Sequence, residues 1–587
     1  MPLMGSLYIG SSGLQTSQNA LNTTAHNLSN VDTVGYTRQQ VQQSDRSYVT
    51  ISVNPKSIAN QEYGLGVTYS RVKHIRDYFL DKTYRRESGR SMFYEVSTEV
   101  LEETESQLGE LNGEAFQDTL SEFWTSIQEL TKDPCSSVTQ GLMVQKASEF
   151  VGRATAIYEG LASYQDNLNN QIKQQVDKIN EYGKKILELN DAIRGIEVGG
   201  VENANDLRDA RDQILDELAE LTNMTCEEDA YGNVSVRIEN VDFIKGGTCY
   251  EIGLHVDETT GFYTPFWPHN ASYHVLDNGV REYNIDGAEV FNMSLEISAD
   301  LGTDIGGLKA MLLARGDHRA DYSDITSGNY DKVEQSVIMN IQAEFDQLIH
   351  GIATTVNDIL AKAAGVKEGA LTNVTLADGT VLSDEQMQNV KYCAADNSTY
   401  MRSEHGQPLQ LFTKITTAGY QKVTATDADG NTGEYWLYME EIYGQQDTMY
   451  TIKNLEANQE LMQNPSRLGF RLADGSEDNA TAEALKDAFS DENYTLNPNV
   501  QKKTSFIGYY DDLVAQVSNS GYVYRSIHTN QLTTVEATQS AREQIVGVSS
   551  DEELSNMIRF QNAYNASSRY INVISQMLEH IINTLGM

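Results

Sequence analysis

With 587 residues the chain is long enough for about three or four domains. Its 43 lysines and arginines against 84 aspartates and glutamates give a formal net charge of −41, which repels phosphates and anionic lipid and argues against nucleic acid or a membrane surface as a partner. A hydrophobic fraction of 40% suffices for ordinary cores, while no apolar run approaches the roughly 20 residues of a membrane span and the start lacks the features of a cleaved signal peptide.

Leucines recur every seven residues near the N-terminus, a spacing that keeps one narrow face turned toward a partner helix, as in a coiled coil. The leucines are Leu7, Leu14, Leu21 and Leu28. We therefore predict a first helix with core contacts through the last three. Asn27 and Asn30 are expected to end this helix, and Gly35 to supply the turn that redirects the chain.

Proline is scarce in the middle of the chain, which permits long helices. Only eight prolines occur, and none lies between Pro134 and Pro265. An isoleucine stripe at seven-residue spacing precedes Gly195, and a second apolar stripe follows at 207–221, so we predict an antiparallel helical hairpin. Helical patterns also occupy 90–160, 330–362 and 505–545, and together they predict an elongated helical bundle.

Two stretches between the helical parts are rich in turn signals and short Val, Ile and Tyr runs, which predict β-structure. They alternate with helix along the chain, so we predict that β-rich domains are inserted into a helical rod. The fold class is mainly α with inserted β-rich domains, an elongated multidomain rod built on a discontinuous helical bundle. The predicted domains are a terminal coiled-coil core (1–45 with 546–587), a helical bundle (46–225, 300–365 and 500–545) and β-rich outer parts (226–299 and 366–499).

The C-terminal segment repeats the seven-residue pattern of the first helix. Its seam consists of Met557, Tyr564, Ile571, Leu578 and Leu585. We predict that the two terminal helices pair at one end of the rod, with ordinary amphipathic helices on a globular domain as the alternative. Because such helices bury little surface alone, we expect them to be poorly ordered in the monomer and to fold on assembly. Ser550 with Glu553 predicts a capping box at the start of the second helix.

Catalytic and metal-binding patterns are missing from the sequence. Cys135, Cys226, Cys249 and Cys393 are scattered, so we expect free thiols rather than two disulfides. No zinc-protease, Walker or nucleophile-elbow motif occurs, and His269 and His274 fit a β-loop. The segment 427–431 starts like a calcium loop but has Thr432 and Tyr438 where glycine and glutamate are required, so we predict a hairpin turn. We assign no catalytic residue, cofactor or metal ligand.

The two ends resemble a known group of proteins. Residues 20–38 contain Asn-Leu-Ser-Asn (27–30) and Gly-Tyr-Thr-Arg (35–38), which resemble the N-terminal signature of flagellar rod, hook and hook-associated proteins. Residues 548–566, with Arg-Phe-Gln-Asn-Ala-Tyr at 559–564, are similar to the ending of the same axial proteins. Both ends match rod, hook and junction proteins alike.

The middle of the chain distinguishes among these proteins. Residues 204–218, with Asn-Asp-Leu, Arg-Asp-Gln and Asp-Glu-Leu in order, resemble a segment of the hook-associated protein 1 family, as do 64–80, Phe123-Trp124 and 306–308. The resemblance covers 1–230, 300–360 and 500–587. A hook or rod protein is disfavoured by 204–218. A secreted adhesin or enzyme with flagellar-like ends is the alternative from another class, with its function in 366–494.

The resemblance implies a structural junction between hook and filament, at the bacterial flagellum outside the cell after type III export. It implies contacts with further copies of the chain in a closed helical layer, with the hook protein, with a second hook-associated junction protein, and with a cytoplasmic export chaperone on the C-terminal helix. The residues expected in the assembly interface are Leu14, Leu21, Leu28, Asn27, Asn30, Gly35, Met557, Tyr564, Ile571, Leu578 and Leu585.

Overall fold

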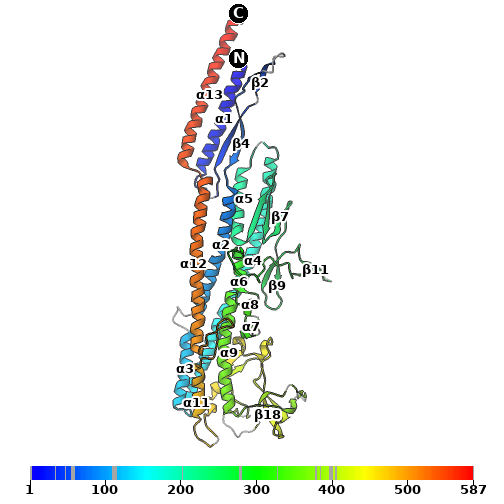
Figure 1. The fold of residues 1–587 in the computed structure, drawn as a ribbon, viewed down its shortest axis with the longest axis vertical. Coiled ribbons are helices and arrows are strands. Elements are labelled where there is room, and N and C mark those ends of the chain that lie inside the picture. Colours follow the sequence, from blue (N-terminus) through cyan, green and yellow to red (C-terminus); the bar gives the residue numbers. More distant parts are fainter. Residues whose placement is uncertain are drawn as a thin grey trace.

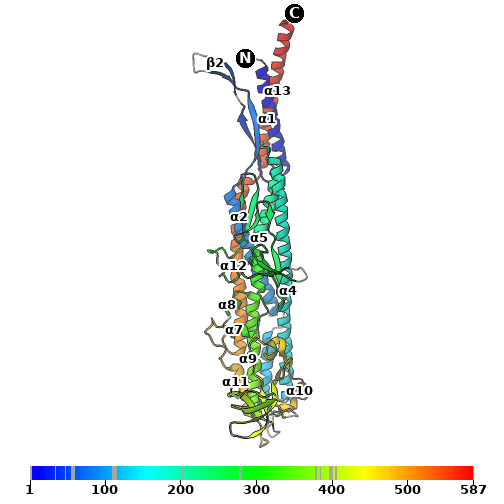
Figure 2. The ribbon, with the colours of Figure 1, turned by 90° about the vertical axis from the view of Figure 1, so that its right-hand side faces the viewer.

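The computed structural model describes residues 3–33, 35–46, 48–53, 60–108, 116–200, 202–276, 281–326, 328, 330–376, 380–383, 385, 387–395, 401–403, 406–472 and 474–585. The molecule is a long rod with both chain ends at the same tip (Figure 1, Figure 2). That tip consists of α1 (Leu3–Ser29) and α13 (Ser550–Leu585), which lie side by side, and of two antiparallel strand pairs. The pairs are β1 (Gln39–Asp45) with β4 (Val67–His74), and β2 (Val49–Val53) with β3 (Asn60–Tyr63).

Helices from three distant parts of the sequence form the body of the rod. They are α2 (Tyr78–Leu108), α3 (Phe116–Lys132), α4 (Ser137–Glu197), α5 (Asn205–Leu221), α6 (Gly307–Arg315), α7 (Tyr322–Thr326), α8 (Tyr330–Val333), α9 (Val337–Ala363) and α12 (Phe506–Val546). The longest, α4, has 61 residues. It is capped by Ser136, whose side chain accepts from the amide of Val138, and no proline interrupts it.

The main core joins these helices at the lower end of the rod, where aromatic rings from several helices meet. The ring of Phe116 lies 5.0 Å from that of Phe345 and 4.9 Å from that of Tyr510, measured between centroids. All three side chains are almost fully buried. Such clusters stabilise a fold through large buried area and favourable ring geometry, and this one ties α3, α9 and the lower half of α12 into one body.

Two β-rich parts project from the rod, as predicted. The first contains β5 (Met224–Glu228), β6 (Val234–Ile238), β7 (Val241–Lys245) and β8 (Thr248–Cys249) in one sheet, then the pairs β9 (Gly253–Val256) with β10 (Tyr263–Phe266) and β11 (Ser272–Val275) with β12 (Arg281–Asn284). The predicted isoleucine stripe of α4 is fully buried against α5 and the first sheet. The predicted helical hairpin is therefore α4 with α5, but α4 begins far earlier than its stripe.

The second part contains a five-stranded antiparallel sheet in the order β13-β15-β18-β17-β14. Its strands are β13 (Lys367–Gly369), β14 (Thr372–Leu376), β15 (Val390–Ala394), β17 (Tyr420–Thr426) and β18 (Thr432–Tyr438). The pair β16 (Phe412–Lys414) with β19 (Leu455–Ala457), three 3-10 turns (Gln446–Thr448, Ile452–Asn454 and Pro465–Leu468) and two helices, α10 (Gln459–Gln463) and α11 (Asn479–Ser490), complete it. The segment 427–431 is the β17–β18 hairpin turn, as predicted, because Asp427 Oδ1 accepts from the amides of Asp429 and Asn431.

A buried carboxyl group in the middle of α9 predicts a pH dependence of stability. Glu344 accepts hydrogen bonds from Asn497 Nδ2 at 2.8 Å and from Gln516 Nε2 at 3.0 Å. Burial raises its pKa to about 7, and these hydrogen bonds offset only part of that rise. Because the folded state binds the proton more tightly, the contribution to stability is complete below the unfolded pKa of about 4.3 and is lost as pH rises through about 7.

We therefore expect Glu344→Gln, which stays neutral, to gain stability relative to the unsubstituted protein between pH 5 and pH 8. One pKa unit corresponds to about 1.4 kcal/mol, so the gain should be roughly 1 to 3 kcal/mol. Urea unfolding of both proteins at each pH measures it. The matched control is Glu536→Gln on the exposed surface of α12, and an equal free-energy difference at both pH values would contradict the prediction.

Candidate functional site: the terminal helix pair and its charged joint

Glycines bring the two terminal helices unusually close together. A Cβ atom added to Gly10 would lie 2.7 Å from Cγ1 of Ile571, and one added to Gly13 would lie 2.9 Å from Oγ of Ser567. Side-chain atoms do not approach so closely, so a larger residue at Gly10 would displace Ile571 and one at Gly13 would displace the hydroxyl of Ser567. The row continues along α1 with Ser17 and Ala20, which are buried. The face of α1 that meets α13 is therefore made of small residues.

The predicted leucine seam lies beside this small-residue row. Leu14, Leu21 and Leu28 are each partly buried, and each directly follows a residue of the row or of its continuation, Gly13, Ala20 or Asn27. One residue along an α-helix turns the side chain by about 100°. The leucines thus flank the contact with α13, and their contacts with other copies stay a prediction. Glycine, serine and alanine at three- and four-residue spacing were the available signal for the row, and the leucine pattern obscured it.

The C-terminal seam is also partly covered. Met557, Tyr564, Ile571 and Leu578 are partly buried, whereas the side chain of Leu585 lies outside the described residues. Elsewhere on α13, large apolar side chains are exposed. They include Ile558 at 61%, Met577 at 50% and Ile582 at 68% exposure. A helix with so much uncovered apolar surface is typical of an element that docks against another chain.

Asn27 organises the turn that follows α1. Its Oδ1 accepts from the hydroxyl of Tyr36 at 2.8 Å and from the amide of Gln39 at 3.1 Å, while its Nδ2 donates to the carbonyl of Gln39 at 2.8 Å and to Glu553 at 3.3 Å. Asn27 therefore fixes the returning strand and reaches α13. Asn30 ends α1 through its amide, which donates to the carbonyl of His26 at 3.2 Å.

Gly35 has a φ of +81°, in the left-handed region that favours glycine. Its position matches the predicted turn. The predicted cap of α13 is displaced by one residue, because the hydroxyl of Ser549, not Ser550, accepts from the amide of Glu552. Glu553 is instead held by Asn27 and by Arg38, whose Nε lies 3.0 Å from its Oε1.

Three arginines and three aspartates connect α2, α5 and α12 directly below the terminal pair. We call this cluster the charged joint, and its members are Arg76, Arg85, Arg542, Asp81, Asp212 and Asp216. Nε of Arg76 lies 2.9 Å from Asp81, and a second nitrogen of Arg76 contacts Asp212. Each arginine side chain is at most 13% exposed, so these pairs are shielded from water.

The other two arginines complete the network. Arg85 bonds Asp216 at 2.6 Å and Asp212 at 3.2 Å. Arg542, near the end of α12, bonds Asp81 at 2.8 Å and Asp216 at 2.7 Å. Each charge in the joint therefore has more than one partner of opposite sign, an arrangement in which mutual attraction can offset the cost of burial.

Attraction to the arginines determines the ionisation of Asp212. Burial alone would raise its pKa, but the positive charges of Arg76 and Arg85 outweigh burial and hold the pKa below its usual value. The neighbouring Asp209 extends the network toward the terminal pair, because its carboxylate lies 2.6 Å from Nε2 of His74 and accepts from the amide of Thr37 at 3.1 Å.

The charged joint contains residues of the segment 204–218, which distinguished this sequence from hook and rod proteins. Asp209, Asp212 and Asp216 are three and four residues apart and so share one face of α5. Their spacing was visible in the sequence at 204–218. Their partners were not, because Arg76, Arg85 and Arg542 come from distant parts of the chain.

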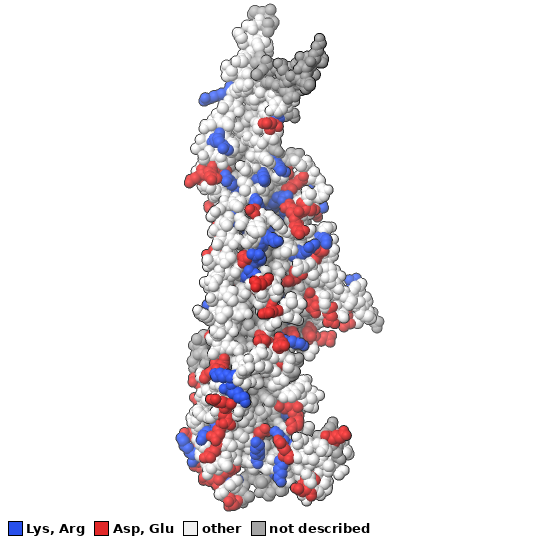
Figure 3. All heavy atoms as spheres, viewed as in Figure 1, with Lys and Arg blue, Asp and Glu red and all other residues white. Residues whose placement is uncertain are grey.

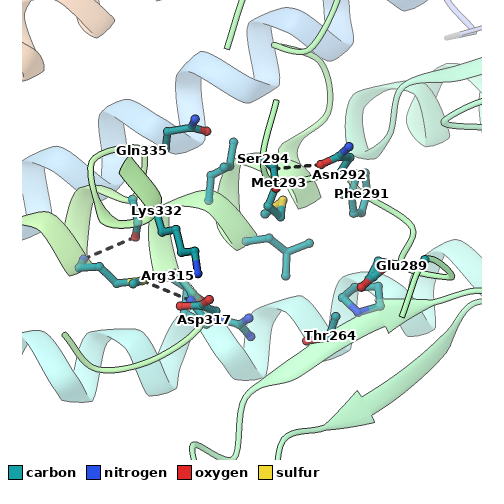
Figure 4. A pocket seen from close by; sticks show the side chains of 17 residues that line it. Thr264, Glu289, Phe291, Asn292, Met293, Ser294, Arg315, Asp317, Lys332 and Gln335 are labelled. Carbon is teal, nitrogen blue, oxygen red and sulfur yellow. Dashed lines mark hydrogen bonds between the residues drawn. The ribbon is translucent and has the colours of Figure 1, made fainter. Parts of the chain in front are cut away.

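The body of the rod contains a cavity of about 540 Å³, which lies between β10, α6, α8 and α9, with Lys332 and Glu289 on different walls (Figure 4). Its most buried polar side chain, Arg315, is already bonded to Asn169 at 2.6 Å and to the carbonyl of Tyr263 at 2.9 Å. No group of His, Cys, Asp or Glu among the described residues could hold a metal ion, and the four cysteines are free thiols.

Comparisons with known proteins give the group of proteins that this chain is similar to. Residues 101–373 match the family described as flagellar hook-associated protein FlgK helical domain. Flagellar hook-associated protein 1 of Bacillus subtilis is 24% identical over 98% of this chain and 97% of its own length. The chain is thus similar to flagellar hook-associated protein 1 over almost its whole length. The protein of the same name from Salmonella typhimurium is 23% identical over 97% of this chain and 98% of its own length.

Two further family matches cover the terminal pair. Residues 7–37 match the flagella basal body rod protein family, and residues 540–584 match the C-terminal family of flagellar basal body rod FlgEFG proteins. The solved structure of the flagellar hook junction protein FlgK from Burkholderia pseudomallei aligns with 81% of this chain and 100% of its own, at 13% identity and a TM-score of 0.46. Where the chain is described, no helix has the length and apolar character of a membrane span.

Proposed function

We propose that this chain is a structural subunit of the bacterial flagellum that joins the hook to the filament, and that its terminal helix pairs pack together in the core of the assembly. The distribution of charge carries the proposal. Residues 1–37 and 554–587 contain only Asp32, Arg559, Arg569 and Glu579 as charged side chains. These cancel, so the net charge of −41 belongs to residues 38–553.

This distribution separates a surface that can self-associate from one that cannot. Copies with a large net charge of one sign repel each other, but residues 1–37 and 554–587, which make up most of the terminal pair, carry no net charge. The terminal pair also exposes the apolar side chains of α13 described above, among them Ile558 and Ile582. Figure 3 shows the same contrast, with few charged side chains at the upper tip and many acidic ones below.

The charged joint suits the mechanical role of a junction. It connects α2, α5 and α12 through buried ion pairs directly below the terminal pair, so force on the core would pass into a braced part of the rod. We further propose the three-part division at 1–45 with 546–587, at 46–225 with 300–365 and 500–545, and at 226–299 with 366–499. The last part would face outward.

The finer expectations belong to the same proposal. The hook protein would bind one face of the layer and a second hook-associated junction protein the other. An export chaperone would cover α13 in the cytoplasm until the chain leaves the cell through the type III apparatus. Binding and stacking would be the whole activity, without catalysis.

Electron microscopy of cells that lack this gene tests the proposal. We expect complete hooks without filaments and flagellin released into the medium, because filament subunits would have no layer on which to polymerise. A plasmid copy of the unsubstituted gene should restore filaments. Missing hooks would indicate a hook or rod subunit instead, and normal filaments would exclude a junction role.

A further inference from the structure

The two halves of α12 have different surroundings. The lower half is part of the main core, and its buried residues are Phe506, Tyr509, Tyr510, Leu513, Val517 and Gly521. From residue 522 upward the helix contacts the rest of the rod through one row, which includes Tyr524, His528 and Gln531. Both ribbon views show this part running along the edge of the rod, below the terminal pair (Figure 1, Figure 2).

The opposite side of this segment is what we call the α12 outer face. It consists of the exposed residues Tyr522, Val523, Ile527, Thr529, Asn530, Leu532, Thr533, Thr534 and Ala537. Between 522 and 546 the charged residues are Arg525, Glu536, Arg542 and Glu543, with no net charge. Arg525 pairs with Glu102 on α2, and Arg542 belongs to the charged joint. Figure 3 shows almost no acidic atoms along this edge.

The threonines of this segment have their hydroxyl protons engaged within the helix. Thr529 donates to the carbonyl of Arg525 at 2.8 Å, and Thr533 donates to that of Thr529 at 3.2 Å. Thr534 and Thr538 donate in the same way, at 3.1 and 2.8 Å. A hydroxyl that already donates to its own backbone loses less when water is removed. The outer face is thus polar in composition, yet its threonine donors need no water.

The upper half of α12, from residue 522 to residue 546, is poorly suited to remain exposed to water. β-Branched residues such as Thr533, Thr534 and Val535 are weak helix formers. A helix that is polar on every side normally depends on ion pairs along its own surface. Here both arginines pair with other helices. Tyr522 is 71% exposed and Leu532 is 42% exposed. These features indicate a surface that is covered in the working state.

We propose that the α12 outer face is a side-to-side contact with a second copy of this chain. The absence of net charge on this face indicates a second copy as the occupant, since two strongly acidic rods can approach only where neither carries net charge. Position supports it, because α12 leads into α13 through a short turn at Gly547, so this face lies directly below the terminal pair that the proposed function places in the core of the assembly. A closed layer of rods needs head-to-tail contacts, so the face packs on a different surface of the neighbour. The proposal rests on the proposed function and adds a second contact to it.

Two added carboxylates test the contact. In Asn530→Glu with Thr534→Glu, both side chains are exposed and one turn apart. Glutamate is a better helix former than either residue, so the thermal midpoint of the purified monomer should not fall. Filament-bearing hooks in the deletion strain should decrease at least about tenfold, because buried unpaired carboxylates oppose the contact. Unchanged filament numbers would overturn the inference while the junction role stood.

Two control variants separate charge from other effects. Asn530→Gln with Thr534→Gln has the same size without the charge, and it should support filaments normally. Ala480→Glu with Ala484→Glu adds the same two charges one turn apart on the exposed face of α11, and it too should support filaments. Loss of filaments in either control would contradict a charge-sensitive contact on α12.

Photo-crosslinking identifies the neighbour directly. A benzophenone amino acid at position 530 in the full chain should, in isolated hook-filament structures, give a product with twice the mass of this chain. The same amino acid at position 480 should not. A crosslink from position 530 to a different protein, or no crosslink in assembled structures, would overturn the choice of a second copy. Filaments that persist after deletion of the gene would contradict the proposed junction function itself.

Discussion

Ile571→Asp should abolish attached filaments while leaving the melting of the rod unchanged. Ile571 packs directly against Gly10 of α1, with its Cγ1 2.7 Å from the position that a Cβ of Gly10 would occupy. An aspartate there would place an unpaired charge in the contact between the two helices, which costs several kcal/mol. The terminal pair is joined to the rod at its base, so we expect the main core to unfold as before.

Two readouts check this prediction. Electron microscopy counts filaments in a deletion strain that carries the variant gene, and circular dichroism follows thermal unfolding of the purified monomer. Ile571→Val is the matched control. It keeps a β-branched apolar side chain, typically at a small cost, and should support filaments. A large decrease in monomer stability would show that the terminal pair is part of the cooperative core, and intact filaments would show that this contact is not needed for assembly.

The fold was predictable as far as local patterns determine it. Seven-residue spacing and scarce proline predicted the terminal helices, the α4–α5 hairpin and α12, and turn signals predicted the β-rich parts. The segments 27–38 and 204–218 predicted the family, which the comparisons confirmed. All of these features belong to short stretches of chain, in which neighbouring residues determine the periodicity.

What could not be predicted depends on contacts between distant segments. Arg542 meets Asp81 and Asp216 only because α12 returns along α2, and no local pattern encodes that return. The strand order of the five-stranded sheet is non-sequential for the same reason. On α1 the contact face was mispredicted because the leucines form a more regular pattern than the glycines. The glycines, however, are the residues that allow α13 to approach.

Asp212→Ala should be among the most destabilising single substitutions in the rod. It would leave Arg76 and Arg85 each short of a partner, and both are largely shielded from water. Removing one member of a buried ion pair costs about 3 to 5 kcal/mol, mostly through the charge left behind. The Asp212 carboxylate is also partly shielded, with 18% of the side chain exposed, so screening by water should reduce this value only in part. Urea unfolding at pH 7 measures it.

The pH dependence of that loss distinguishes an ionic joint from simple packing. The pKa of Asp212 is lowered in the folded state, so its contribution is complete above the unfolded value of about 3.9 and is lost as pH falls through the folded value. The difference between variant and unsubstituted protein should therefore be constant from pH 8 to pH 5 and decrease below pH 4. Asp242→Ala is the matched control. It also removes an aspartate paired with arginine at 2.9 Å, but at the surface of β7, where water screens the charge and little change is expected. Equal losses in the two variants would mean that burial does not strengthen the joint, and a difference that persists at low pH would assign the loss to packing.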